Sequence, residues 1–182
     1  HCFMKQFNEA HGRSCKLALS GFLNIDKPQG ITSHDVVARI RRILKRDFGK
    51  AKVGHAGTLD PLATGVLVIC LGQATRLSEY VMATTKTYRA TLKLGITTDT
   101  YDADGTVETV ADASQITLGD IEQCLPVYIG EIDQLPPMYS AIKQQGKKLY
   151  EWAREGKVVE RQPRQVTIHS IEIVDWLSPE LT

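Results

Sequence analysis

A glycine-rich stretch with a single carboxylate, residues 54–65, constrains the fold of this chain more than any other feature. It reads Gly-His-Ala-Gly-Thr-Leu-Asp-Pro-Leu-Ala-Thr-Gly, with a glycine at each end and another at position 57. Glycine permits close backbone approaches, and a proline disfavours helical backbone in the residue before it. The pattern therefore predicts a loop that holds Asp60 outside regular structure and displays its carboxylate.

Length and composition predict one domain with a real core. The chain has 182 residues, of which 42% are hydrophobic and 24% are charged, as in ordinary globular domains. Its longest apolar run, Val66–Leu71, is far shorter than the roughly 20 residues that span a bilayer. The four cysteines are scattered without a C-x-x-C pair, which favours reduced thiols in a cytoplasm over a zinc site or disulfide scaffold.

Charge is strongly segregated along the chain although the net charge is only +1. Residues 39–52 contain seven lysines and arginines and one acid, Asp47, whereas residues 99–133 contain acids and no lysine or arginine. Segregation of this kind creates an electrostatic footprint that an average conceals. The basic segment predicts a face that meets phosphate.

The elements before the loop follow from turn and capping patterns. We expect a leader over residues 1–20, a short strand at 22–25 and a turn at 27–30. Thr32-Ser33-His34-Asp35 matches a capping box that opens a helix. That helix is predicted to turn its arginines outward and to bury five residues at helical spacing: Val36, Val37, Ile40, Ile43 and Leu44.

After the loop the patterns predict short, alternating elements. The predicted strands are 66–71, buried on both faces, 86–94, 128–132 and 166–176, and the predicted helices are 75–82, 118–125 and 149–154. Thr117 would cap the second of these helices, and residues 134–137 break the chain. Strict alternation over 86–94 places Tyr88 on the inward face of its strand, where an aromatic residue serves packing by default.

Residues 54–65 resemble the signature of the bacterial tRNA pseudouridine synthase B family, with Asp60 at the position of its essential aspartate. A lone Asp-Pro dipeptide is ordinary turn chemistry and by itself favours a structural role. The match extends over all of residues 54–65, however, and its length favours a catalytic role for Asp60. The resemblance implies that Asp60 is the nucleophile or stabilising carboxylate when the N1 to C1' bond of uridine is cleaved. Attack on C1', attack on C6 and a glycal route all stay open.

His55, within the same stretch, and two further segments resemble family elements. The resemblance implies that His55 helps hold the target nucleotide out of its stack. Lys86-Thr87-Tyr88 resembles a K-x-Y element whose tyrosine stacks on the extruded base. Residues 27–33 resemble the first motif, which packs against the catalytic loop, and we assign it no catalytic role.

RNA contacts are expected on two basic regions. The helix from Arg39 leads into the loop, so phosphate contact is expected there. Residues 136–150 resemble the thumb loop that closes over the T arm of tRNA. The expected RNA-binding residues are Arg39, Arg42, Lys143, Lys147 and Lys148.

The resemblance implies an α+β chain with the pseudouridine-synthase fold, built on a mixed, mostly antiparallel sheet with flanking helices. Residues 21–182 would form the catalytic domain. Family members continue into a segment with a tyrosine and an arginine that pair with the catalytic machinery, and usually into a small RNA-binding domain. We therefore hypothesise that this chain, which stops at Thr182, is a fragment with an incomplete site.

The implied activity is isomerisation of the uridine at position 55 in the T loop of tRNA, by a cytoplasmic monomer without cofactor, metal or membrane. Alternatives are the catalytic subunit of a guide-RNA-dependent pseudouridine synthase, a tRNA-binding chaperone without catalysis, and a purely structural domain. The acidic run 99–105 lacks carboxylates where a calcium loop requires them. Neither G-x-x-x-x-G-K-[ST] nor G-x-G-x-x-G occurs, so no nucleotide cofactor is implied.

Overall fold

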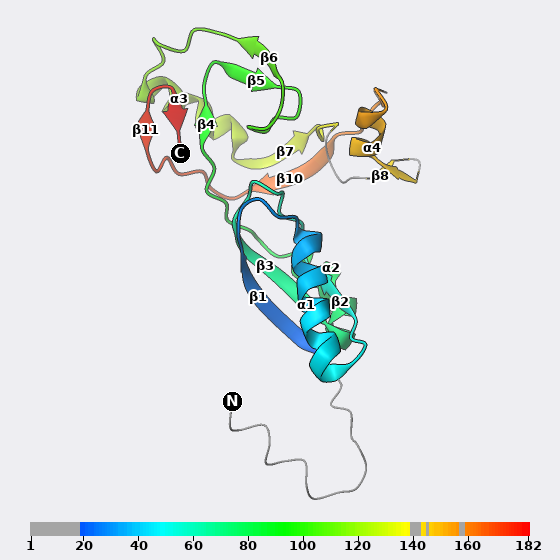
Figure 1. Ribbon diagram of the computed structural model, residues 1–182. Coiled ribbons are helices and arrows are strands. Elements are labelled where there is room, and N and C mark those ends of the chain that lie inside the picture. The colour runs from blue at the N-terminus through cyan, green and yellow to red at the C-terminus, as the bar shows by residue number, and fades with distance from the viewer. Residues whose placement is uncertain (1–18, 139–142, 145, 157–158) are drawn as a thin grey trace, which may run out of the picture. The chain divides into compact units, whose positions relative to one another are not determined.

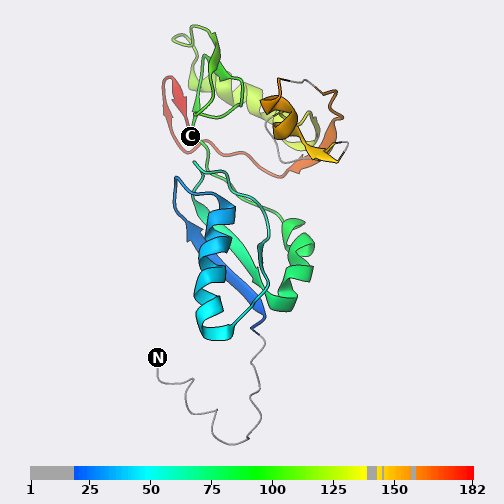
Figure 2. The same cartoon turned by 45° about the vertical axis from the view of Figure 1, so that its right-hand side comes forward.

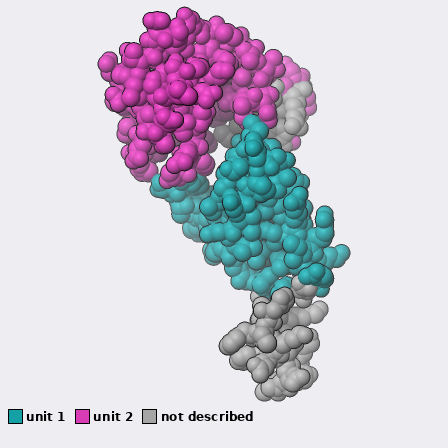
Figure 3. All heavy atoms as spheres, turned by 60° about the vertical axis from the view of Figure 1, so that its left-hand side comes forward, with its two compact units in different colours: residues 1–86 teal, residues 87–182 magenta. Residues whose placement is uncertain are grey.

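The computed structural model describes residues 19–138, 143–144, 146–156 and 159–182. The chain divides into two compact units, residues 1–86 and residues 87–182, which Figure 3 colours separately. Residues 1–18 of the expected leader lie outside the described part of the chain. The expected single domain over residues 21–182 stays a prediction, and each unit is described by itself.

The first unit is built on a three-stranded antiparallel sheet with the order β1-β3-β2 (Figure 1). Its strands are β1 (Gly21–Lys27), β2 (Val53–His55) and β3 (Gly65–Leu71). The register pairs Ile25 with Leu67 and Lys27 with Gly65. The strands expected at 22–25 and 66–71 are therefore confirmed, each somewhat longer than predicted, with the glycine-rich loop between β2 and β3.

Helix α1 (Ser33–Phe48) begins where the capping box predicts. Thr32 is the N-cap, its hydroxyl accepts from the backbone N–H of Asp35, and the carboxylate of Asp35 accepts from the backbone N–H of Thr32. These bonds satisfy backbone donors that a helix start leaves without partners. The first turn is thus fixed by residues three positions apart.

The core of the first unit lies between α1 and one face of the sheet (Figure 2). Six buried side chains form it: Val36, Val37, Val53, Leu67, Ile69 and Leu71. Two burial predictions were wrong. Ile43 is 58% exposed and lies at the edge of the apolar stripe of the helix. Val66 is 68% exposed, on the face of β3 opposite Leu67.

The segment after β3 is helical, as expected, but begins with a tighter helix. It consists of the 3-10 helix η1 (Gly72–Leu77) followed by the short helix α2 (Ser78–Met82). Cys70, at the end of β3, is fully buried and burial raises the pKa of its thiol. This agrees with its prediction as a small core residue.

The second unit consists of short strands and helices. They are β4 (Leu92–Lys93), β5 (Ile96–Thr98), β6 (Val107–Val110), α3 (Leu118–Cys124), η2 (Leu125–Tyr128), β7 (Gly130–Gln134), β8 (Lys143–Gln144), β9 (Lys147–Lys148), α4 (Leu149–Arg154), β10 (Arg164–Ile168), β11 (Trp176–Leu177) and β12 (Glu180–Leu181). They form four small antiparallel sheets, β10-β7, β11-β12-β4, β5-β6 and β8-β9. The helices expected at 118–125 and 149–154 are confirmed, and Thr117 caps the first with a capping box to Asp120.

Three strand predictions in this unit were partly wrong. Of the stretch 86–94, only Leu92–Lys93 is strand, because only these residues find a partner, β12. Tyr88 is therefore not inward: it is 70% exposed. The strand expected at 128–132 begins at Gly130, and the one expected at 166–176 is interrupted between Ile168 and Trp176. Alternation shows which residues can share a face, but a strand also needs a neighbour to bond.

The fold class is α+β, as predicted. All strand pairings among the described residues are antiparallel. The described part of the chain has no helix long and apolar enough to cross a bilayer.

Candidate active site

The glycine-rich loop is closed at its base by strand pairing. β2 and β3 pair antiparallel with His55 opposite Ile69, and the N–H of Ala56 donates to the carbonyl of Val68 over 2.8 Å. Within the loop, Gly57 has φ +107° and Gly65 has φ +106°, which residues with a side chain rarely adopt. Two of the glycines thus shape the loop, as the sequence pattern predicts.

Leu59, the residue before Asp60, is held by Ser33. The Ser33 hydroxyl donates to the carbonyl of Leu59 and accepts from its N–H, each over 2.9 Å. Ser33 is buried, and the side chain of Leu59 packs against the core. The first turn of α1 therefore fixes the backbone immediately before the carboxylate.

Pro61, the residue after Asp60, is held by the turn between β1 and α1. Its carbonyl accepts from the N–H of Gly30 over 2.8 Å and from Nζ of Lys27 over 3.4 Å. The same Nζ donates to the carbonyls of Ile31, over 2.8 Å, and Pro28, over 3.0 Å. Lys27 is fully buried, so its three donors meet three carbonyls in place of water.

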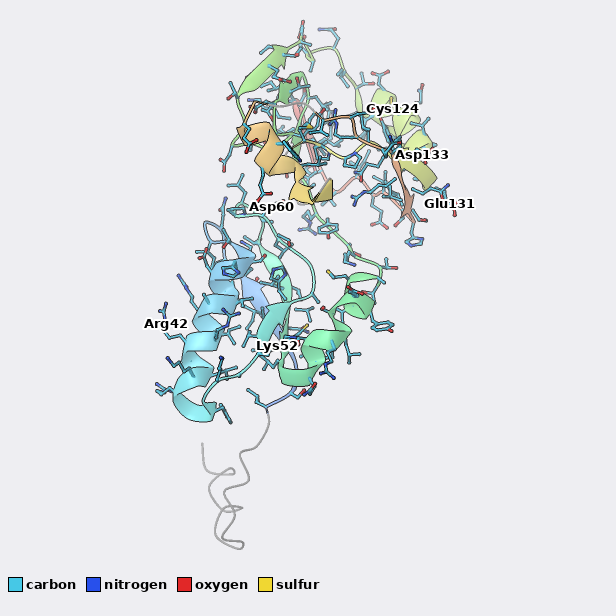
Figure 4. All side chains as sticks on the ribbon, turned by 90° about the vertical axis from the view of Figure 1, so that its right-hand side faces the viewer. Arg42, Lys52, Asp60, Cys124, Glu131 and Asp133 are labelled. Carbon is cyan, nitrogen blue, oxygen red and sulfur yellow. The ribbon has the colours of Figure 1, made fainter. Side chains whose placement is uncertain are left out.

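Asp60 is exposed between these two fixed neighbours. Its own carbonyl accepts from the N–H of Ala63 over 3.1 Å, which closes a tight turn. Figure 4 shows Asp60 at the end of the first unit where α1 begins. The backbone of Asp60 is thus fixed from both sides while its carboxylate is open to a ligand.

His55 lies at the start of the loop and is half-buried. Its Nδ1 is 2.7 Å from the carbonyl of Gly57. Because a carbonyl only accepts, Nδ1 carries the hydrogen in this contact, which leaves Nε2 as the ring atom available for another partner. The contact orients the imidazole within the same loop as Asp60.

An exposed carboxylate on a pinned backbone can act as a nucleophile or stabilise developing positive charge. Among the described residues no group of three or more His, Cys, Asp or Glu side chains could hold a metal ion. The exposed side chain of Asp60 offers carboxylate chemistry.

The remaining predicted site residues fall in both units. Arg39 and Arg42 are exposed on α1, in the unit that holds Asp60 and His55. Tyr88 belongs to the second unit and is exposed. Lys143 pairs with Lys148 and Gln144 with Lys147 in the β8-β9 hairpin, and residues 139–142 of the expected thumb segment lie outside the described residues.

The hydrogen-bonding roles of Lys27 and Ser33 were missed from the sequence, which indicated only a turn and a helix cap that pack on the loop. One signal was present. Residues 23, 25 and 27 share a face of β1 by strand alternation, and Leu23 and Ile25 lie opposite the core residues Ile69 and Leu67. A lysine on a core face needs buried acceptors.

Sequence comparisons match this chain to known proteins. Residues 42–182 match the family model described as TruB family pseudouridylate synthase (N terminal domain). A protein of Clostridium perfringens named tRNA pseudouridine synthase B is 53% identical over 154 residues, which cover 85% of this chain and 51% of that protein. A protein of the same name from Syntrophotalea carbinolica is 49% identical over 164 residues, which cover 90% of this chain and 52% of that protein.

A solved structure shares the fold. It is described as an H/ACA RNP bound to a substrate RNA containing 2'-deoxyuridine, and its matched chain is 26% identical with a TM-score of 0.58, covering 91% of this chain and 37% of that chain. These matches show that the chain has the pseudouridine-synthase fold. The chain belongs to the TruB family of pseudouridylate synthases. It spans about half the length of the curated relatives that it matches.

Proposed function

We propose that this chain carries the catalytic aspartate of a tRNA pseudouridine synthase that isomerises the uridine at position 55 in the T loop. The observation that carries the proposal is the display of Asp60, whose two neighbours are held by hydrogen bonds from Ser33, Gly30 and Lys27. In the reaction the C1' to N1 bond of uridine breaks and a C1' to C5 bond forms. C5 loses a hydrogen and N1 gains one, so no cofactor or metal is consumed.

Each site residue has a role in this proposal. Asp60 is the nucleophile or charge-stabilising carboxylate, His55 helps hold the extruded nucleotide, and Tyr88 stacks on its base. The RNA-binding residues are Arg39, Arg42, Lys143, Lys147 and Lys148, which meet the T arm. The enzyme acts in the cytoplasm as a monomer. The names of the relatives and the exposure of Asp60 and Tyr88 support these roles.

The test is pseudouridine formation on an unmodified tRNA transcript, mapped by position. The chain is compared with Asp60→Asn and with Asp26→Asn, which makes the same change at an exposed carboxylate on β1. Product at the T-loop uridine from the chain and from Asp26→Asn, with none from Asp60→Asn, would establish the activity and the role of Asp60. Equal product from Asp60→Asn would contradict the assignment. Salt-dependent tRNA binding without product from any of the three proteins would point to an incomplete site or to a chaperone, and a protein as long as the relatives would separate these two.

A guide-RNA-dependent activity is the second candidate, because the H/ACA RNP structure shares the fold. The identity to that chain is 26%, against 53% to the Clostridium perfringens protein, so the stand-alone reaction is better supported. Product in a reaction that contains only this chain and tRNA excludes a requirement for guide RNA. Product that appears only after a guide RNA is added would favour the second candidate.

A further inference from the structure

In the second unit, the paired strands β7 and β10 lead to the hairpin β8-β9. The ladder between β7 and β10 stops at Gln134 and Arg164. Just past it lie Pro136 and Pro137 on one segment and Pro163 on the other. Proline has no backbone N–H to donate, so it ends a ladder of this kind. Figure 1 shows β8 and α4 beyond this end of the two strands.

The side chain of Arg161 joins the two segments where the backbone ladder has ended. Its Nη1 donates to the carbonyl of Pro136 over 3.0 Å, across 25 positions of sequence. Pro136 is buried and Arg161 is half-buried, so the carbonyl would be left without a donor if the guanidinium were removed. Arg161 thus continues, with a side chain, a connection that the prolines interrupt.

The side chain of Arg164 makes a different kind of bond three positions further on. Its Nε and Nη2 donate to Oε1 of Gln134 over 3.0 Å and 2.8 Å. Both residues are exposed, and their backbones already pair in the ladder. Loss of an exposed side chain of this kind has little effect on stability. Of the two arginines, only Arg161 holds a backbone position that the ladder leaves free.

The segment between Pro136 and Arg161 contains the three lysines of the β8-β9 hairpin that the proposed function assigns to RNA. Lys143 pairs with Lys148 in this hairpin. Helix α4 follows β9 directly, and its first residue, Leu149, is only 1% exposed. Packing of α4 therefore holds one side of the hairpin, whereas the bond from Arg161 fixes the chain where it leaves β7. A segment with fixed ends has less conformational freedom to lose when it binds a ligand.

We infer that Arg161 is a positioning residue for RNA binding: its bond to the carbonyl of Pro136 sets the direction in which the chain leaves β7 for the β8-β9 hairpin. The inference rests on the proposed function, since it takes the lysines of this hairpin to meet RNA. Arg161 acts through the backbone of Pro136 and needs no contact with the RNA itself. Its removal therefore weakens RNA binding and leaves the chemical step unchanged.

The experiment compares Arg161→Met with Arg164→Met in the 182-residue chain. Both changes remove one positive charge at the same end of the β7-β10 pair, but only the first removes the donor of a buried backbone carbonyl. Arg161→Lys is the rescue variant, because an ammonium group also donates to a carbonyl. Affinity for an unmodified tRNA transcript, KM and kcat for pseudouridine formation, and thermal unfolding are measured for each variant and for the unchanged chain.

We expect Arg161→Met to bind tRNA about 10-fold more weakly, with a matching rise in KM and with kcat within about twofold, because RNA must then order the start of the hairpin. Arg164→Met should change affinity by less than about twofold, and Arg161→Lys should recover most of the lost affinity. Equal losses in the two methionine variants would show an effect of charge alone and overturn the inference. A loss confined to kcat, or no recovery with lysine, would also overturn it.

Limited proteolysis with trypsin tests the position of the hairpin without RNA. Trypsin cuts after the lysines of β8 and β9, which are Lys143, Lys147 and Lys148. Cleavage there should be about 10-fold faster in Arg161→Met, because a segment with a free end opens more often. Equal cleavage rates in Arg161→Met and Arg164→Met would overturn the inference. If Arg161→Met does not fold, Arg161→Gln replaces it, since glutamine removes the charge and shortens the side chain.

Product formation separates this inference from the proposed function. Product from the unchanged chain, with equal tRNA affinities in the two methionine variants, would leave the function standing and overturn the inference. No product from the unchanged chain, with a loss of affinity confined to Arg161→Met, would count against the function in this chain and support the positioning role. Failure of the unchanged chain to bind tRNA would overturn the inference.

Discussion

The hydroxyl of Ser33 and the backbone of Leu59 exchange two hydrogen bonds, each 2.9 Å long, across 26 positions of sequence. One residue further on, Asp60 is exposed. A buried serine at the start of a helix thus sets the backbone that aims the carboxylate. Lys27 and Gly30 act in the same way on Pro61, from the other side of Asp60.

Replacing Ser33 with alanine should lower kcat for pseudouridine formation by about 10- to 100-fold with a smaller change in KM, because a misplaced reacting group slows the chemical step. The free energy of unfolding should fall by about 1–3 kcal/mol, since two hydrogen bonds are lost. Steady-state kinetics and thermal unfolding measure the two effects. Ser78→Ala is the control, because Ser78 donates one bond to Thr75 outside the loop. Equal losses of kcat in both variants would contradict a positioning role for Ser33.

Replacing Lys27 with methionine should destabilise the first unit by about 1–3 kcal/mol, because buried carbonyls lose their donor. Activity should fall by more than the loss of folded protein accounts for. The reason is that Lys27 also holds the carbonyl of Pro61, the residue after Asp60. Denaturant unfolding and turnover at a temperature well below the midpoint measure the effects. Lys86→Met is the stability control, because Lys86 also donates to backbone carbonyls but is exposed. A Lys27→Met protein as active as the unchanged chain would exclude this role.

Replacing Tyr88 with alanine should reduce activity while changing the free energy of unfolding by no more than about 0.5 kcal/mol, as expected of an exposed site. Its side chain is 70% exposed, so little packing is lost. Loss of base stacking should lower activity by about 10-fold or more, since stacking contributes about 1–3 kcal/mol per base. Tyr80→Ala, at a tyrosine 75% exposed on α2, should leave both quantities near their starting values. A large loss of stability in Tyr88→Ala would instead indicate a packing role.

The capping box of α1 should make stability depend on acid pH. Hydrogen bonds from the side chain and the backbone of Thr32 lower the pKa of Asp35. A carboxyl whose pKa is lower in the folded chain stabilises that chain above its unfolded pKa, about 4, and this stabilisation is lost as the pH falls through the folded pKa. Asp35→Asn should therefore lower Tm at pH 6, and the difference should shrink as the pH approaches 3.

Thermal unfolding from pH 6 to pH 3 measures this dependence. Glu108→Gln removes an exposed carboxylate of β6 and serves as the control for a change of net charge. A Tm difference between Asp35→Asn and the unchanged chain that stays constant over this pH range would show that the ionised cap is not its source.

Local patterns predicted the parts of the site that depend on neighbours in sequence. Both capping boxes join residues three positions apart, and Pro61 restricts Asp60 directly. The exposed position of Asp60 and the two helices that these boxes open were therefore predictable. The small helix α4 was also predicted from its own segment of sequence. The strand over 86–94 was not, because its existence depended on a partner from the C-terminal part of the chain, and β12 reaches only Leu92 and Lys93.

The sequence by itself determined the identity of the loop, the residue that it displays and the family to which it points, because glycine, proline and capping residues restrict the backbone within a few positions. Only the tertiary structure decided that Lys27 is buried, that it meets Pro61 across 34 positions, and that Tyr88 and Ile43 are exposed. Burial and long-range hydrogen bonds depend on which surfaces meet when the chain folds. A pattern of residue types along one segment does not contain that information.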